Sequence, residues 1–157
     1  MKRKQSAGLL MYRRRGEALE VLLVHPGGPF WARRDEGAWT IPKGEIIQGS
    51  DANPLATACR EFQEETGMTP TGPFVALTPV RQKGGKVVHA WAFAGDCDPG
   101  TLKSNLFTME WPPRSGRFAE FPEVDCAEFF GLQAARAKLN PAQVAWLDEL
   151  TRALAQR

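Results

Sequence analysis

The chain has 157 residues, of which 43% are hydrophobic and 24% charged, and its mean hydropathy is -0.34. These values are typical of a soluble globular protein, and the length predicts one domain over residues 1–157. The formal net charge of +2 excludes a general nucleic-acid binder and a polybasic membrane anchor. No apolar run is long enough for a membrane span or a signal peptide.

The three cysteines, Cys59, Cys97 and Cys126, are widely spaced. An odd, scattered set favours reduced thiols over a disulfide framework or a zinc site, and reduced thiols predict a cytoplasmic protein. We therefore expect a small-molecule ligand, with no nucleic-acid or membrane partner. No pattern in the sequence fixes the oligomeric state.

The first third of the chain predicts strands. Apolar runs at 6–12 and 19–25 flank a polar turn at Gly16, which indicates a hairpin. Glycines and prolines then indicate a loop over 25–37, and residues 38–41 predict a brief strand that ends before a proline.

A helix is predicted from Pro54 to Thr66. Asn53 can cap its first turn, proline suits the first helical position, and Gly67 suits a left-handed C-terminal cap. At about 100° per residue, Leu55, Cys59 and Phe62 share one side of this helix, so we expect this side to face the core.

The remainder mixes strands and helices. Residues 74–80 and 86–94 predict a strand pair, 96–125 a long irregular stretch, and 127–130 a last strand. A short helix should start near Leu132, and a final helix at Pro141 should place Val144, Leu147 and Leu150 on one side. The fold class is thus α/β (α+β) with a mixed sheet, since the strand pairs argue against a doubly wound parallel one.

Three carboxylates crowd the end of the predicted 54–66 helix. Glu61, Glu64 and Glu65 lie opposite the core side, on one exposed arc near the negative end of the helix dipole. Arg60 can neutralise only part of this charge. A hard divalent cation such as magnesium would explain the arrangement, and a solvated acidic surface is the alternative.

The stretch "REFQEETGM" at 60–68, with Gly44 upstream in "WTIPKGE", resembles the Nudix box of the Nudix (MutT-like) hydrolase superfamily. The order of elements along the chain is similar to that fold, an α-β-α sandwich with a mixed sheet between helices. The stretches "SAGLLMYRR", "WTIPKGE" and "EVDCAEFFGL" resemble the branch that includes dinucleoside tetraphosphate hydrolases.

The resemblance implies metal-dependent hydrolysis of a nucleoside diphosphate linked to another moiety. The metal ligands would be Glu61, Glu64, Glu65 and the carbonyl of Gly44, holding Mg²⁺ or, as an alternative, Mn²⁺. Arg60 would orient Glu64. The general base would be a box glutamate or one from a later loop, for which Glu123 is the first candidate and Glu120 the second.

One departure from the family pattern lies between Gly44 and Arg60. This segment is two residues longer than the pattern, with the extra length in "GSDAN" at 49–53, and the usual glutamate is missing. Asp51 or Glu45 could take its place.

Substrate contacts are predicted from residue types. Lys43, Arg81 and Lys83, with Lys86, could meet phosphates, although a solvated hairpin tip is an alternative for the last three. Trp111 and Arg114, with Arg117, could stack on a base and pair with phosphate, and Phe30 and Trp31 offer a second platform; structural packing is the alternative reading for these aromatics. His25 and His89 fit structural strand positions better than a general base.

The most probable substrate on these grounds is a dinucleoside polyphosphate. The alternatives are nucleoside triphosphates, nucleotide sugars and diphosphoinositol polyphosphates, the last favoured if Arg33, Arg34, Lys83 and Lys86 converge on one cleft. A non-catalytic Nudix-fold nucleotide sensor is the alternative of another class, disfavoured because all three box acids are present.

Overall fold

The computed structural model describes residues 4–156. A six-stranded sheet has the order β4-β5-β1-β2-β8, with β3 paired to β1, and a separate two-stranded sheet joins β6 to β7. The strands are β1 (Gln5–Arg15), β2 (Ala18–Pro26), β3 (Lys43–Glu45), β4 (Val75–Arg81), β5 (Val87–Ala94), β6 (Leu106–Glu110), β7 (Phe118–Pro122) and β8 (Val124–Gly131). The helices are α1 (Pro54–Thr66), α2 (Leu132–Lys138) and α3 (Ala145–Ala155), with 3-10 turns η1 (Pro99–Thr101) and η2 (Pro141–Gln143).

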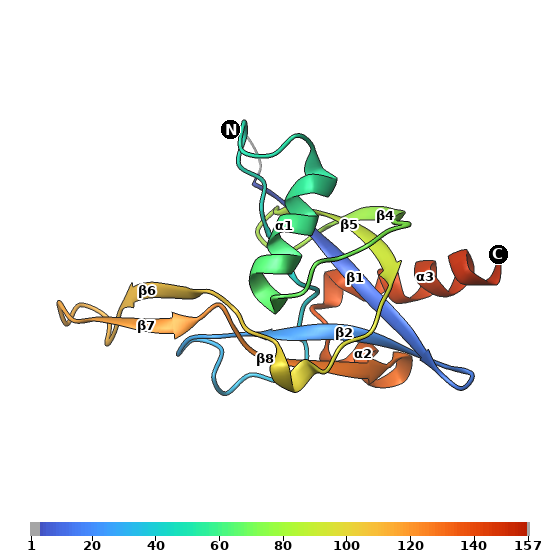
Figure 1. Cartoon of the computed structure of the whole chain (residues 1–157). Coiled ribbons are helices and arrows are strands. Elements are labelled where there is room, and N and C mark those ends of the chain that lie inside the picture. Colours follow the sequence, from blue (N-terminus) through green and yellow to red (C-terminus); the bar gives the residue numbers. More distant parts are fainter. Residues whose placement is uncertain (1–3, 157) are drawn as a thin grey trace.

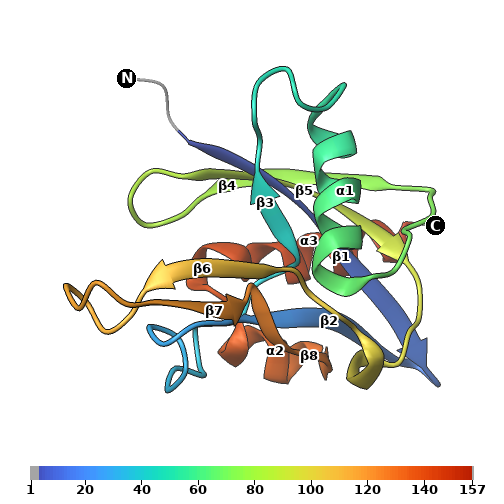
Figure 2. The ribbon, with the colours of Figure 1, turned by 60° about the vertical axis from the view of Figure 1, so that its left-hand side comes forward.

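The sheet is mixed and lies between helices, as predicted. β1 runs parallel to β5 and antiparallel to β2. Helix α1 covers one face of the sheet, and α2 and α3 lie on the other (Figures 1 and 2). No helix among residues 4–156 is long and apolar enough to cross a membrane.

Alternating side chains of β1 supply both apolar layers. Leu9 and Met11 pack in the cluster beneath α1, whereas Leu10 and Tyr12 pack in the larger cluster with α2 and α3. Because successive residues of a strand point to opposite faces, one fully buried strand can build two cores. The sheet therefore supports α1 rigidly, including the residues on the side of α1 that faces away from the sheet.

Helix α1 confirms its predicted ends. The side chain of Asn53 accepts a hydrogen bond from the Ala56 N–H at 2.9 Å, and Gly67 ends the helix at φ 78. Phe62 is fully buried, and Leu55 packs with it in the same cluster, as the predicted core side requires. The face opposite this core side carries the acidic residues.

The predicted strand at 38–41 is wrong. Trp39 and Thr40 form only isolated bridges, and the true strand follows at β3. The Ile41 N–H donates to the side chain of buried Gln143 at 3.1 Å instead of to a neighbouring strand. This side-chain bond replaces strand pairing, so the segment stays irregular while it remains tightly held.

The prediction that 96–125 is irregular is wrong in its second half. Residues 106–110 and 118–122 pair as the β6–β7 hairpin, and β8 begins at Val124 rather than at residue 127. Phe107 and Phe121 face each other across this hairpin and are half-buried. The final helix also differs in its start, because a 3-10 turn precedes α3; Leu147 and Leu150 are buried, and Val144 packs against them, as predicted.

Candidate active site

The acidic side chains of α1 are partly covered, so the prediction of an exposed acidic arc is wrong. The Glu61 side chain is only 15% exposed, and Glu64 is 38% exposed. The cover comes from β3 on one side, since the backbone of Gly44 lies directly against the Glu61 carboxylate. The site is therefore a half-buried cluster of carboxylates rather than a solvated surface.

Strand β3 fits this cluster closely. A methyl group added at Gly44 would lie 1.9 Å from the Cδ of Glu61 and 2.2 and 2.3 Å from its two carboxylate oxygens. The N–H of Lys43 donates to Glu65 Oε2 at 3.1 Å. Only a residue without a Cβ lets the backbone approach α1 this closely. Of the residues predicted to bind a metal, the structure places Glu61 against Gly44 and Glu65 at the neighbouring Lys43 N–H.

Glu123 adds a fourth carboxylate from the corner between β7 and β8. Burial, followed by the charge of Glu64, raises the pKa of Glu123. Burial is also the main cause of the raised pKa values of Glu61 and Glu65, to which the charge of Glu123 adds the smallest contribution. Glu123 is thus within electrostatic reach of these carboxylates, although about 60 positions separate them in the sequence.

Burial and mutual repulsion raise the pKa values of carboxylates in this cluster. Burial, followed by the charge of Glu61, raises the pKa of Glu65 to about 8, although Lys43 opposes the shift. Burial, followed by the charge of Glu64, raises the pKa of Glu61. Several carboxylates with raised pKa values in one half-buried place are a frequent mark of a functional site, and oxygen donors suit a hard cation.

Arg60 joins the cluster to the long loop before α1. Its Nη1 donates to Glu61 at 3.1 Å and to Glu64 at 3.1 Å, while Nε and Nη2 donate to Asp51. Asp51 also accepts from the Thr57 hydroxyl at 2.8 Å. The hydrogen bonds from Arg60 and Thr57 lower the pKa of Asp51, whose side chain therefore stays charged.

The longer loop carries a carboxylate to Arg60. Of the two candidates, the structure brings Asp51 to Arg60, whereas Glu45 is exposed. Aspartate is shorter than glutamate, and the two extra residues let the loop carry its carboxylate to the guanidinium. Arg60 is held from both sides, by Asp51 on the loop and by Glu61 and Glu64 on the helix.

The donor set fits a divalent metal in its chemistry: glutamate oxygens, a glycine backbone that touches one of them, and raised carboxyl pKa values. Over residues 4–156, however, no three acidic, histidine or cysteine side chains are gathered as a finished metal cage. Glu61 and Glu64 both accept from Nη1 of Arg60, which uses only Oε1 of Glu61. The second oxygen of Glu61 is therefore open to a metal while Arg60 stays in place.

Lys43 is a second cation beside the cluster, in addition to Arg60. Burial, followed by the charge of Lys86, lowers the pKa of Lys43, while Glu65 and Glu61 oppose the shift. Arg81 at the end of β4 and Lys83 in the following turn are exposed. The structure thus brings Lys43 to the acidic residues, with Lys86 beside it, and leaves Arg81 and Lys83 at the surface of the β4–β5 hairpin.

The predicted aromatic contacts lie away from the acidic cluster, at the far end of the β6–β7 hairpin (Figure 2). Trp111 packs edge-on against Phe30, with ring centroids 5.5 Å apart. The backbone N–H of Arg114 donates to the Glu110 carboxylate at 2.9 Å. The two aromatic platforms considered separately in the sequence therefore form one.

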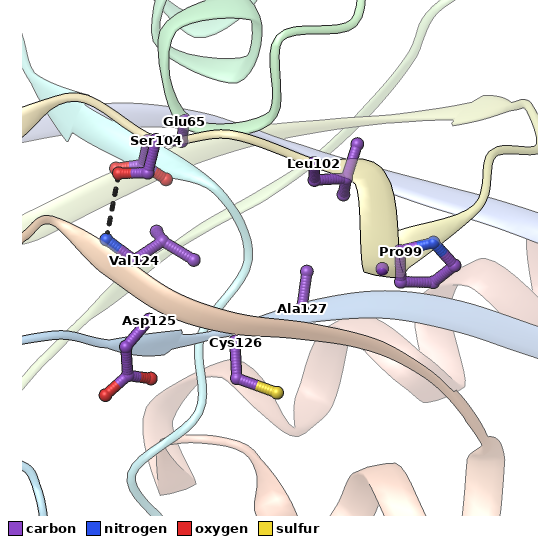
Figure 3. Close-up of a pocket in the computed structure, with 9 residues that line it drawn as sticks. Glu65, Pro99, Leu102, Ser104, Val124, Asp125, Cys126 and Ala127 are labelled. Carbon is purple, nitrogen blue, oxygen red and sulfur yellow. Dashed lines mark hydrogen bonds between the residues drawn. The ribbon is translucent and has the colours of Figure 1, made fainter.

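A cavity of about 220 Å³ adjoins the acidic cluster at Glu65 (Figure 3). It lies between η1, the segment after it and the first residues of β8, where the Val124 N–H donates to the Ser104 hydroxyl at 3.0 Å. Sequence reasoning missed this cavity, because its walls come from three separate segments. The apolar positions Leu102 and Ala127 are its sequence signal, but neither stands out alone.

The two histidines have structural partners, in agreement with their sequence interpretation. His25 is buried and bridges two segments, with Nδ1 2.8 Å from Asp125 and Nε2 2.6 Å from the Arg34 carbonyl. His89 pairs with Gln5 at 2.7 Å. His25 thereby fixes the 26–37 loop to the start of β8, two residues after Glu123.

The family comparison supports an enzyme of the pyrophosphohydrolase class. The chain belongs to the Nudix hydrolase family, since the model of the NUDIX domain matches residues 2–152. A comparison with curated proteins gives no match.

Three solved structures illustrate the likeness in fold. The Caenorhabditis elegans Ap4A hydrolase in a binary complex has a TM-score of 0.66 and 21% identity, covering 98% of this chain and 99% of that one. The NUDIX domain of Shewanella oneidensis NrtR, in complex with ADP ribose, has a TM-score of 0.66 and 16% identity, covering 99% and 90%. The MutT protein from Methanosarcina mazei Go1 has a TM-score of 0.61 and 18% identity, covering 96% and 94%. At these identities the likeness establishes the fold alone.

Proposed function

We propose that the protein hydrolyses a phosphoanhydride bond of a dinucleoside polyphosphate, with Mg²⁺ as its metal and Mn²⁺ as a substitute. The observation that carries this proposal is the close fit of β3 to the carboxylates of α1: the Gly44 backbone lies against Glu61, and the Lys43 N–H donates to Glu65. Glutamate oxygens suit a hard cation, and Glu123, within electrostatic reach of them, is the candidate general base. The cytoplasm, predicted from the reduced cysteines, is the proposed compartment.

The metal ligands in this proposal are the three box glutamates and the Gly44 carbonyl. A bound divalent metal neutralises charge on the transferring phosphoryl group and lowers the pKa of a water molecule. Arg60, fixed by Asp51, positions Glu64 and limits the rotamers open to it. Its guanidinium also compensates part of the negative charge while the metal is being exchanged.

Glu123 is the proposed general base. It is exposed to solvent at the corner before β8, and its pKa is raised by burial and by the charge of Glu64. A raised pKa makes a carboxylate a better proton acceptor near neutral pH. Its carboxylate would take the proton from the attacking water molecule. The backbone bond from the Gly27 N–H to the Glu123 carbonyl, 3.0 Å, holds this corner in place.

Phosphate recognition is proposed for Lys43 at the cluster, with Arg81 and Lys83 as outer contacts. Trp111 and Arg114 would contact the nucleoside. The fold shared with an Ap4A hydrolase supports a dinucleoside polyphosphate. The ADP ribose complex of the NrtR domain supports a nucleotide-type ligand in general. The alternative substrates are nucleoside triphosphates, nucleotide sugars and diphosphoinositol polyphosphates.

A substrate panel tests the proposal. Purified protein with Mg²⁺ should release phosphate-containing products fastest from a dinucleoside tetraphosphate, more slowly from a nucleoside triphosphate or nucleotide sugar, and not at all in excess EDTA. Product identification by ³¹P NMR would locate the cleaved bond. A preference for inositol pyrophosphates would overturn the substrate assignment, and tight nucleotide binding without any turnover would favour the sensor.

A further inference from the structure

A group of aromatic side chains is exposed at the far end of the β6–β7 hairpin. We name Phe30, Trp31 and Trp111 the aromatic tip. Phe30 is 61% exposed and Trp31 is 37% exposed, although both belong to large apolar residue types. Exposed aromatic groups of this kind on a protein surface commonly mark a binding site.

The aromatic tip is a built structure rather than two adjacent loose loops. Gly27 and Gly28 let the loop touch the hairpin, since a Cβ on Gly27 would lie 1.9 Å from the Pro122 carbonyl oxygen and one on Gly28 would lie 2.9 Å from the Phe107 ring. The Trp31 N–H donates to the Gly28 carbonyl at 3.2 Å. The loop is therefore fixed on the hairpin, and the Phe30 ring is held 5.5 Å from that of Trp111.

The loop and the hairpin turn that carry these rings contain four arginines, along with the acidic residues Asp35, Glu36 and Glu110. Four exposed arginines, two on the loop and two on the hairpin, have no salt bridge within residues 4–156: Arg33, Arg34, Arg114 and Arg117. The guanidinium of Arg34 lies 5.5 Å from the centroid of the Trp31 ring. Aromatic faces beside unpaired guanidinium groups have the chemistry that binds a nucleobase and its phosphates.

The same hairpin connects the aromatic tip to the acidic cluster. The Trp111 N–H donates to the Arg117 carbonyl at 2.9 Å, and from Arg117 the chain runs along β7 to Glu123. At roughly 3.4 Å per residue, the tip lies about 20 Å from Glu123. A ligand that reaches both places must carry its base far from the scissile bond, which a chain of several phosphates allows.

We propose that the aromatic tip binds the distal nucleobase of a dinucleoside polyphosphate whose phosphates lie at the acidic cluster. This inference rests on the proposed function, because it assumes that the cluster receives the phosphate chain. The unpaired arginines would contact the phosphate next to the distal nucleoside. The hairpin thus selects long two-ended substrates over single nucleotides.

Equilibrium binding tests the proposal. The affinities of diadenosine tetraphosphate and adenosine tetraphosphate, which differ by the distal adenosine, are measured by calorimetry with Mg²⁺ on Glu64→Gln protein. Stacking on an aromatic side chain changes affinity by about 5- to 150-fold. We expect diadenosine tetraphosphate to bind at least 5-fold more tightly than adenosine tetraphosphate. Adding Trp111→Ala or Phe30→Ala to the Glu64→Gln protein should bring the ratio of the two affinities near one. Trp111→Phe should restore most of the difference.

Phe118→Ala is the matched control. Phe118 is 69% exposed in the same hairpin, and strand alternation places it on the face opposite to Phe121. This variant should keep the ratio of the parent. Equal affinities of the two nucleotides for the parent would overturn the proposal, and so would an unchanged affinity ratio in Trp111→Ala. A change of oligomeric state in Phe30→Ala would also overturn it, because the aromatic tip would then be a self-association surface. If the wild-type protein shows no hydrolysis but the affinity ratio is as expected, the proposed catalytic function is rejected and the proposed binding role of the aromatic tip is retained.

Discussion

Gly44→Ala should remove most of the hydrolytic activity and leave the fold intact. The added methyl group would lie 1.9 Å from Glu61 Cδ, and real Cβ atoms essentially never come closer than 3.0 Å to another heavy atom. The Glu61 carboxylate is the end of a flexible side chain, so it can retreat by a rotamer change while the backbone of β3 stays paired with β1. The retreat must exceed about 1 Å, a displacement that can cost on the order of 100-fold in rate.

This loss corresponds to about 2.7 kcal/mol of transition-state stabilisation. The assay is kcat/KM with Mg²⁺ on the best substrate of the panel, together with thermal unfolding. Gly131→Ala is the matched control, because Gly131 has φ -63 and no heavy atom within 4 Å of an added Cβ. Full activity in Gly44→Ala would refute the view that this backbone and Glu61 form one site, and a collapse of thermal stability would refute the view that Glu61 alone gives way.

The other predictions concern charge. Asp51→Asn removes the carboxylate that accepts from Nε and Nη2 of Arg60, so we expect a lower urea midpoint of unfolding and a roughly 10-fold lower kcat. Urea unfolding and steady-state kinetics measure these changes, and wild-type values in both would contradict the role given to Asp51. The metal-free protein should lose stability as pH rises from about 5 to 8. Glu65 has an ordinary pKa of 4.5 and a folded pKa of about 8, so the folded state binds more protons within this window. The expected fall is about 3.5 kcal/mol, since about 2.5 of the roughly 3.5 units between the two pKa values take effect within this window and each unit is worth about 1.4 kcal/mol. Urea unfolding in EDTA at several pH values measures this change. Glu65→Gln should flatten the dependence of stability on pH. A rise in wild-type stability between about pH 5 and 8 would contradict the raised pKa of Glu65.

Local signals explain why the sequence predicts α1 well. The Asn53 cap, the Gly67 end and the apolar spacing of Leu55 and Phe62 are all short-range features, and the structure reproduces each of them. The same holds for the β1–β2 hairpin at Gly16. Such elements are encoded within a few residues and do not depend on distant parts of the chain.

Long-range pairing explains most of what the sequence did not reveal. The β6–β7 hairpin was missed because Phe107 and Phe121 find each other across a long irregular tip rich in proline, glycine and arginine. The burial of Glu61 depends on Gly44, 17 positions earlier, and no helical pattern contains that information. The contact of Phe30 with Trp111 likewise joins two loops that carry no common motif.

Hydrolysis by Glu64→Gln gives the most direct test of metal-dependent catalysis at the carboxylate cluster. Glu64 contributes both to this cluster and to the anchoring of Arg60, and glutamine keeps its size while removing its charge. The exposed turn residue Glu17, changed to glutamine, is the matched control. We predict that Glu64→Gln retains the wild-type circular dichroism spectrum and loses nearly all Mg²⁺-dependent product release, whereas Glu17→Gln keeps it. Undiminished turnover in Glu64→Gln, or turnover by the wild type in excess EDTA, would contradict the central claim.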